Sequence, residues 1–204
     1  MPKFASLLAS LAIVSAVATA ASAQTPPTVR IRGTIEAVDG SMLSIKSREG
    51  TDMKVKMTDN VAVFAVVKTD LAQVKEGSYI GVSAMPEPDG TQKAIAVHIF
   101  PENQRGAAEG FRPWDARANS TMTNATVAQT VKGTDGQNIT VKYKDGEKKV
   151  VVPPDTPIVT FVASDKSELK PGAKLIIFGA VKKDDGSLEA NRVNVGRDGV
   201  TPPM

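Results

Sequence analysis

The chain has 204 residues, of which 23% are charged and 41% hydrophobic, and it carries a formal net charge of +3 with no cysteine. So small a net charge argues against a surface built for nucleic acid, and the lack of cysteine excludes disulfides and thiolate metal sites. Any folded domain must therefore be held by its own apolar core.

The first 23 residues have the pattern of a secretory signal peptide. Lys3 supplies the positive charge, residues Phe4–Ala20 are apolar, and Ala21–Ala23 matches the small-residue cleavage pattern. The sequence predicts a mature chain that begins at Gln24, in a periplasmic or secreted location. No later stretch is long and apolar enough to span a bilayer, so we expect no transmembrane anchor after cleavage.

Alternation of apolar and polar residues predicts three strands after a short leader. A short helix follows: Asp70 caps it, Gln73 completes a capping box, and Gly77 ends it. Two further strands come next. The expected strands are Val29–Ile35, Met42–Lys46, Met53–Met57, Tyr79–Ala84 and Lys93–Ile99, with the apolar run Val61–Val67 in the connection after the third strand.

The same pattern recurs about 96 residues later. Asp39-Gly40 returns as Asp135-Gly136, and Asp70–Gly77 returns as Asp165–Gly172. Such a nearly constant offset indicates duplicated domains. The second copy is expected to end in strands Lys174–Val181 and Glu189–Val195.

Five strands with a small helix after the third have the element order of the OB-fold barrel. The sequence therefore predicts an all-β protein of two tandem small five-stranded OB-like β-barrels. The first module is expected to span residues 24–100 and the second 120–204, joined by an irregular interdomain linker, 101–119. Other small five-stranded barrels fit the same order.

Three motifs at the joint between the modules are the most specific basis for a family comparison: His98–Glu102, Arg112–Asp115 and Ser120–Thr126. On these, and on the segments from Gly33–Gly40 to Val193–Val195, the chain resembles the DUF5666-like group of bacterial periplasmic proteins. The resemblance implies tandem OB-like modules in the periplasm and brings no established activity. Relatives of this type often carry His where this chain has Phe111.

The linker holds the chain's one tryptophan and the best candidate for recognition. Aromatic side chains flanked by charge are typical of surfaces that bind a glycan or a protein partner. The alternative interpretation is that Trp114 packs between two small barrels, with Arg112 or Arg117 bridging to Glu102 or Glu109. The candidate ligand- or partner-binding residues are Phe111, Arg112, Trp114 and Asp115.

A metal site is the second candidate. His98 is the one histidine and lies four residues before Glu102, so the pair could ligate a metal with nearby carboxylates. Transition-metal sites usually collect several nitrogen or sulfur ligands, however, which this chain lacks.

The sequence contains neither a nucleophile elbow nor a phosphate-binding glycine loop, so we expect no enzyme activity, no catalytic residues and no cofactor. The predicted function is that of an exported, soluble, non-enzymatic binding protein. Its expected partner is an envelope protein or a glycan and not nucleic acid. The alternative is a periplasmic metal-handling protein that uses His98.

Overall fold

The structure, a computed structural model, describes residues 26–204 apart from residue 135, so the predicted signal peptide lies outside the described residues. Within that part, no helix has the length and apolar character needed to span a bilayer. The elements are β1 (Thr28–Asp39), β2 (Met42–Ser47), β3 (Asp52–Lys68), η1 (Leu71–Gln73), β4 (Tyr79–Pro86), β5 (Gln92–Ile99), η2 (Glu102–Gln104), β6 (Gly110–Pro113), β7 (Thr121–Gly133), β8 (Gly136–Tyr143), β9 (Gly146–Val152), β10 (Ile158–Ser164), η3 (Lys166–Glu168), β11 (Lys174–Lys182) and β12 (Leu188–Gly196).

A closed five-stranded barrel, here called the first barrel, is formed by β12, β11, β1, β2 and β3 in that order. Parallel pairing between β12 and β3 joins the two ends of the sheet. The inward-facing positions hold aliphatic side chains that are almost completely buried, among them Leu43, Val55 and Val193. The predicted all-β class and a closed five-stranded barrel are confirmed.

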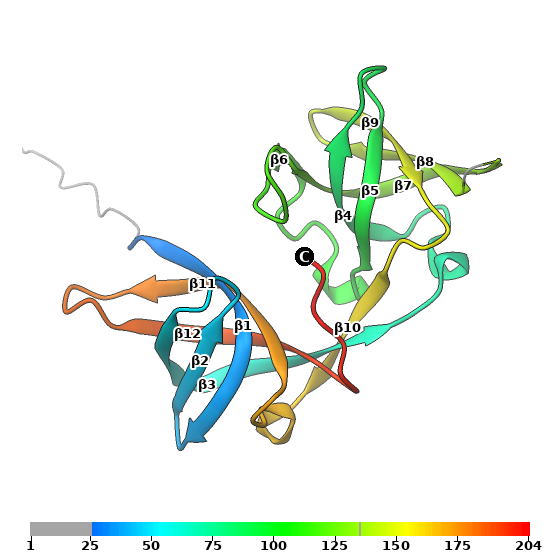
Figure 1. The fold of residues 1–204 in the computed structure, drawn as a ribbon. Coiled ribbons are helices and arrows are strands. Elements are labelled where there is room, and N and C mark those ends of the chain that lie inside the picture. The colour runs from blue at the N-terminus through cyan, green and yellow to red at the C-terminus, as the bar shows by residue number, and fades with distance from the viewer. Residues whose placement is uncertain (1–25, 135) are drawn as a thin grey trace, which may run out of the picture.

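Five further strands form what we call the second ring, in the order β5, β4, β7, β8 and β9 (Figure 1). Its ends meet in a short parallel pairing between β5 and β9, where Gln92 lies opposite Val150. A separate apolar core fills it, with Ile80, Val97 and Val141 at its centre. Strand β6 pairs with the first residues of β7, Thr121–Asn124, ahead of the part of β7 that pairs with β8.

Each ring draws its strands from both halves of the sequence, which corrects the expectation that segments 24–100 and 120–204 close separately. Strands β1–β3 close with β11 and β12, whereas β7–β9 close with β4 and β5. The physical reason lies in β3, because the apolar run Val61–Val67 continues this strand instead of forming a connection. The long strand carries the chain out of the first barrel before η1 turns it into β4.

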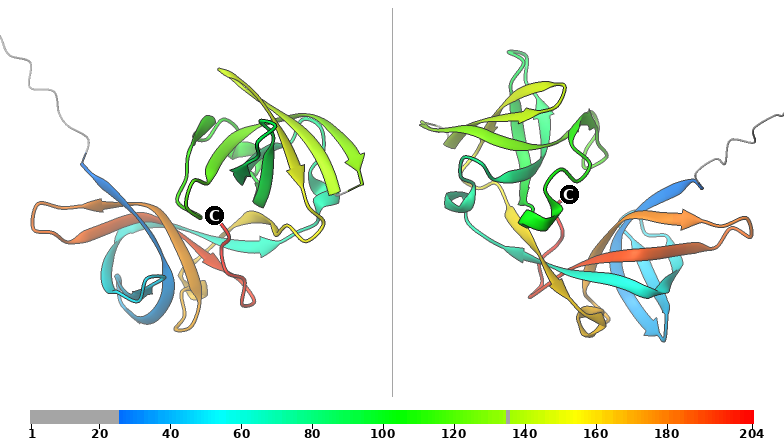
Figure 2. Two further views of the ribbon diagram at one scale, coloured as in Figure 1. Left: turned by 45° about the horizontal axis from the view of Figure 1, so that its top comes forward. Right: turned by 180° about the vertical axis from the view of Figure 1, so that it is seen from behind.

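The second half of β3 pairs antiparallel with β10, and this pair connects the two rings because β12 pairs with β3 and β5 pairs with β10 (Figure 2). Val63 pairs with Ser164 and Lys68 pairs with Val159. In the repeat, Val63 corresponds to Val159 and Lys68 corresponds to Ser164, each 96 residues later. The two pairs are therefore equivalent. The exchange of strands is therefore nearly two-fold symmetric about the pairing of β3 with β10.

The predicted helices are single 3₁₀ turns of three residues, η1 and η3. The Asp165 side chain caps η3 by accepting the Ser167 N–H at 2.7 Å. Asp70 makes no such bond, so the capping box predicted with Gln73 is wrong. Three residues are too few to form an α-helical hydrogen-bond ladder.

The segment 101–119 is more regular than the predicted linker. It contains η2 and strand β6, and Arg112 of β6 lies opposite Met122 of β7. A four-residue strand is too short to show an alternating pattern in sequence. The pairing fixes this segment against the second ring, where it faces the first barrel.

Candidate functional site: a cavity between the two rings

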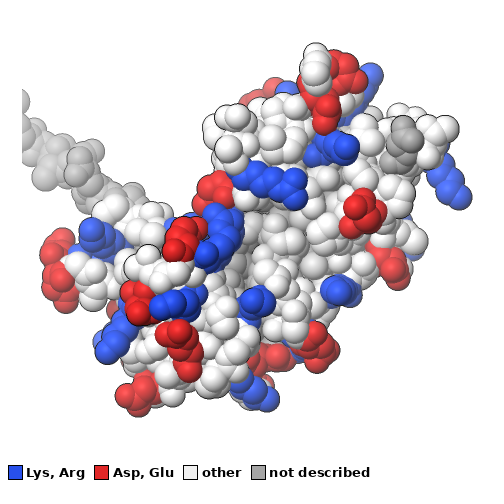
Figure 3. Space-filling view, viewed as in Figure 1, with Lys and Arg blue, Asp and Glu red and all other residues white. Residues whose placement is uncertain are grey.

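A cavity of about 340 Å³ lies where the two rings meet, here called the central cavity. It is assembled from strands of both halves of the chain together with η2 and the segment after β6. Basic side chains gather on the face drawn in Figure 3 along the junction between the rings. The lining residues are Arg30, His98, Phe100, Gln104, Ala107, Ala108, Arg112, Trp114, Met122, Asn124, Phe161, Phe178 and Arg192.

His98 forms part of the apolar wall of the central cavity. On β5 it lies opposite Gly81 of β4, and a Cβ atom at Gly81 would be only 2.1 Å from the His98 Cε1. The imidazole packs edge-on against Phe100 and tilted against Phe161, with ring centroids 4.0 and 5.0 Å away. Burial, followed by the charges of Arg192 and Arg112, lowers the pKa of His98 to about 3. The ring is neutral near pH 7 and presents one donor and one acceptor.

Two of the arginines that line the central cavity have no carboxylate partner among the described residues. Arg192 on β12 lies over the Phe64 ring at 4.1 Å and donates to the side-chain oxygens of Asn194 and Gln104, at 3.1 and 3.2 Å. Arg112 on β6 donates to the Ala108 carbonyl at 2.8 Å. Burial lowers the pKa of both guanidinium groups, which stay charged but are partly desolvated.

Trp114 contacts the first barrel through its ring. The Arg30 guanidinium of β1 lies 3.7 Å from the ring centroid, and Phe178 of β11 packs against the indole at 6.4 Å. These contacts support the predicted packing of Trp114 between the two cores. Because Trp114 also lines the central cavity, packing and recognition share one side chain.

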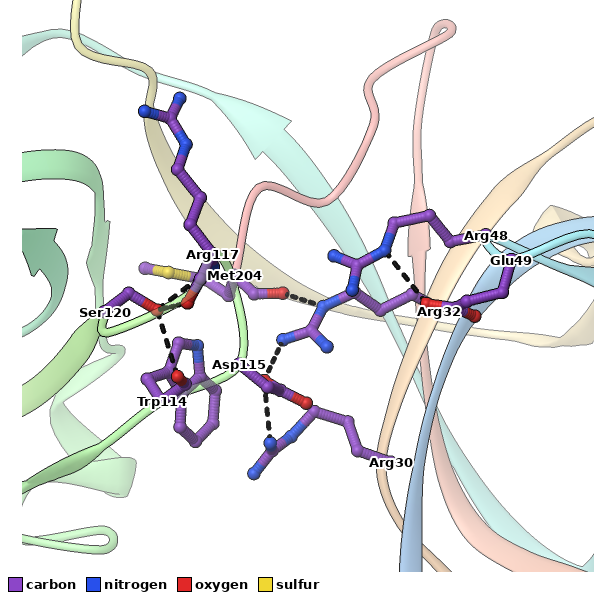
Figure 4. A network of polar contacts seen from close by, with 9 residues as sticks. All are labelled: Arg30, Arg32, Arg48, Glu49, Trp114, Asp115, Arg117, Ser120 and Met204. Atoms are coloured by element: carbon purple, nitrogen blue, oxygen red, sulfur yellow. Dashed lines mark hydrogen bonds and ion pairs between the residues drawn. The ribbon is translucent and has the colours of Figure 1, made fainter.

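Asp115 joins the Trp114 segment to β1 (Figure 4). Its carboxylate accepts from Arg32 at 2.8 Å and pairs with Arg30 at 2.9 Å. The hydrogen bond from Arg32, followed by that from Arg30, holds the pKa of Asp115 well below its usual range. Arg32 also donates to the Met204 carbonyl oxygen at 2.6 Å, so the last residue belongs to the same network.

Most buried polar side-chain atoms without a hydrogen-bond partner surround the central cavity. In the described part of the chain six such atoms occur, and five belong to its lining residues. Native proteins leave few buried polar groups unpaired, so a cluster of them needs an explanation. The five atoms are Arg30 Nε, His98 Nδ1 and Nε2, Trp114 Nε1 and Asn124 Oδ1.

The structure brings together only some of the predicted site residues. Arg112, Trp114 and His98 line the central cavity, although they were predicted as parts of separate recognition and metal sites. Phe111 does not line it: the ring is 39% exposed and lies beneath Lys148. Asp115 anchors the segment from outside the cavity lining.

Glu102 does not join His98. Its carboxylate pairs with Arg105 at 2.6 Å. Within the described residues neither Arg112 nor Arg117 forms the predicted ion pair with Glu102 or Glu109, and Glu109 instead accepts the Lys144 backbone N–H. Among the described residues, no group of three or more His, Cys, Asp or Glu side chains is arranged to hold a metal ion.

Sequence reasoning missed Arg30, Arg192 and Phe161. One signal was available for Arg192, because the equivalent position in the first copy, 192 − 96 = 96, is the small apolar Ala96. A charged residue that replaces a buried alanine within a strand is a departure from the repeat. The same offset relates His98 to Asn194, and both are buried polar residues.

A larger groove of about 790 Å³ lies beside the C-terminal residues. Three of the five cationic residues that line it form ion pairs: Arg32 with Asp115, Lys46 with Asp52 and Arg48 with Glu49. None of the five unpaired atoms belongs to its lining residues. We therefore take the smaller central cavity as the candidate site.

The chain matches no family model, no curated protein and no solved structure.

Proposed function

We propose that this is an exported, non-enzymatic binding protein of two OB-like barrels that holds a small ligand in the central cavity. The observation that carries the proposal is the cluster of five buried, unpaired polar atoms around one cavity. Concave sites with apolar walls and a few convergent polar groups are typical of small-molecule binding. Export is supported by the signal-peptide pattern and by the resemblance to DUF5666-like periplasmic proteins.

Two features favour binding over catalysis or metal handling. An imidazole with a pKa of about 3 is a poor general base near neutral pH. The charged groups that depress this pKa, Arg192 and Arg112, would also repel a metal cation at His98. The geometry therefore supports the metal-handling alternative less well.

The proposal is tested by blocking the mouth of the cavity. Ala107 is exposed and lines the cavity, so Ala107→Phe adds bulk there without replacing a polar group. Ala128 is also exposed and lies on β7 outside the cavity lining, which makes Ala128→Phe the matched control. Thermal unfolding of the mature chain, residues 24–204, is measured for all three proteins against a library of small metabolites and divalent metals.

A ligand present at a hundred times its dissociation constant stabilises the protein by about 2.7 kcal/mol, a shift of several degrees. We expect such shifts in the wild type and in Ala128→Phe, and their loss in Ala107→Phe. Equal shifts in all three proteins would contradict a ligand in the central cavity. A shift produced by a divalent metal and abolished by His98→Gln would instead support metal handling.

A further inference from the structure

We propose that the ligand of the central cavity is a small organic anion with a flat apolar body. This inference rests on the proposed function and adds the chemical class of the ligand. Three arginines line the cavity, and none of its lining residues is acidic. Asp115 is shared between Arg30 and Arg32, and among the described residues no ion pair is formed by Arg112 or Arg192.

The two unpartnered cations are costly to bury alone, and both are partly desolvated. A carboxylate, sulfonate or phosphate placed between them would accept charge-assisted hydrogen bonds, often bidentate, from the guanidinium forks. Arg192 lies 5.8 Å from the Phe161 ring centroid, and the His98 ring packs against the same Phe161 ring at 5.0 Å, so the guanidinium and the imidazole are neighbours in the cavity. Arg112 lies 5.6 Å from the Trp114 ring in the same lining. A neutral imidazole can donate a further hydrogen bond to the same anion.

The remaining wall fits an aromatic or other flat apolar group. Phe161 and Phe178 lie 6.4 Å apart between ring centroids in an edge-to-face arrangement, and Trp114 packs beside Phe178. Aromatic faces and edges of this kind favour a stacked planar ligand. A cationic ligand would meet the same aromatic rings but would be repelled by the arginines.

The experiment compares three probes by titration calorimetry on the mature chain: 4-phenylbutyrate, its neutral amide 4-phenylbutyramide, and acetate, which has the charge without the ring. We expect the carboxylate to bind about ten- to a hundredfold more tightly than the amide, the range that a charge-assisted hydrogen bond supplies. Acetate should bind more weakly than 4-phenylbutyrate because it lacks the apolar body.

Arginine variants locate the anion. Arg112→Gln and Arg192→Gln should each weaken binding of 4-phenylbutyrate by about tenfold and leave that of the amide within about twofold. Arg48→Gln is the matched control, because Arg48 is exposed, pairs with Glu49 and lies outside the cavity lining. Perturbation of the ring resonances of His98, the chain's one histidine, should accompany binding of the carboxylate.

Equal binding of the carboxylate and the amide would overturn the inference, as would an equal effect of Arg48→Gln. If both probes bind equally and Ala107→Phe abolishes both, the cavity binds ligands but does not select anions, so the proposed function survives alone. If none of the three probes binds, the ligand class is overturned, and the metabolite screen with Ala107→Phe still decides the proposed function.

Discussion

The buried imidazole of His98 makes the stability of the protein depend on pH with a calculable sign and size. Its pKa is about 3 in the folded chain, against an ordinary value of 6.5. Between these values the unfolded chain binds a proton that the folded chain excludes, so the free energy of unfolding falls as the pH decreases. From about pH 7.5 to about pH 5 the loss is about 2 kcal/mol, and His98→Gln removes this contribution.

The measurement is urea unfolding of the wild type and of His98→Gln at several pH values. The pKa of Asp115 is also depressed, so this carboxylate stabilises the folded state above its ordinary pKa and loses that effect in acid. Because Asp115 is present in both proteins, its contribution cancels in the difference between their free energies of unfolding. That difference should change by about 2 kcal/mol between about pH 7.5 and about pH 5.

A difference that stays constant over this range would refute the reasoning, since His98 would then titrate alike in both states. The chain contains a single histidine, so an NMR titration of its ring resonances measures the folded pKa directly. This titration gives the answer on the wild type alone if His98→Gln fails to fold.

Four further properties follow from the packing and the strand pairings. Gly81→Ala should lower the free energy of unfolding by about 1–3 kcal/mol, because the new Cβ meets the His98 ring, and the double variant with His98→Ala should recover part of the loss in urea unfolding. Trp114→Ala should lower the free energy of unfolding in urea by about 2–4 kcal/mol, because the indole packs against the first barrel. An unchanged free energy of unfolding would show that the indole serves recognition alone. Asp115→Asn should lower the free energy of unfolding by about 1 kcal/mol at neutral pH. The difference from the wild type should shrink below about pH 4, as the wild-type carboxylate becomes protonated. Calorimetry should show one unfolding transition with equal calorimetric and van't Hoff enthalpies, because neither ring is complete without strands from both halves; two separated transitions would contradict the strand pairings.

The sequence predicted the strands well because alternation reports directly which side chains face a core. The predicted strand Tyr79–Ala84 is β4, Tyr79–Pro86, and Lys93–Ile99 is β5, Gln92–Ile99. Alternation does not report which strand is the neighbour. Strands β4 and β5 have the same alternation as β11 and β12. The alternation therefore does not determine which of the two pairs lies beside β1.

The site was only partly predictable for the same reason. His98, Arg112 and Trp114 were predicted as candidate binding residues because they are rare or unusual in an aliphatic chain. All three line the cavity. Their partners Arg192 and Phe161 lie in the second half of the chain and reach the cavity through the strand exchange. Sequence distance conceals such a site, because its geometry depends on pairings between remote segments.

The exchange of strands also fixes the order in which the chain can fold. The first barrel requires β12, which ends at Gly196, so β1 cannot enter a closed barrel until nearly the whole chain is available. Closure over such a long sequence separation is slow compared with local pairing. Until then β4 and β5 compete with β11 and β12 for the same edges, and a chain that closes its first half on itself must reopen before the central cavity can form.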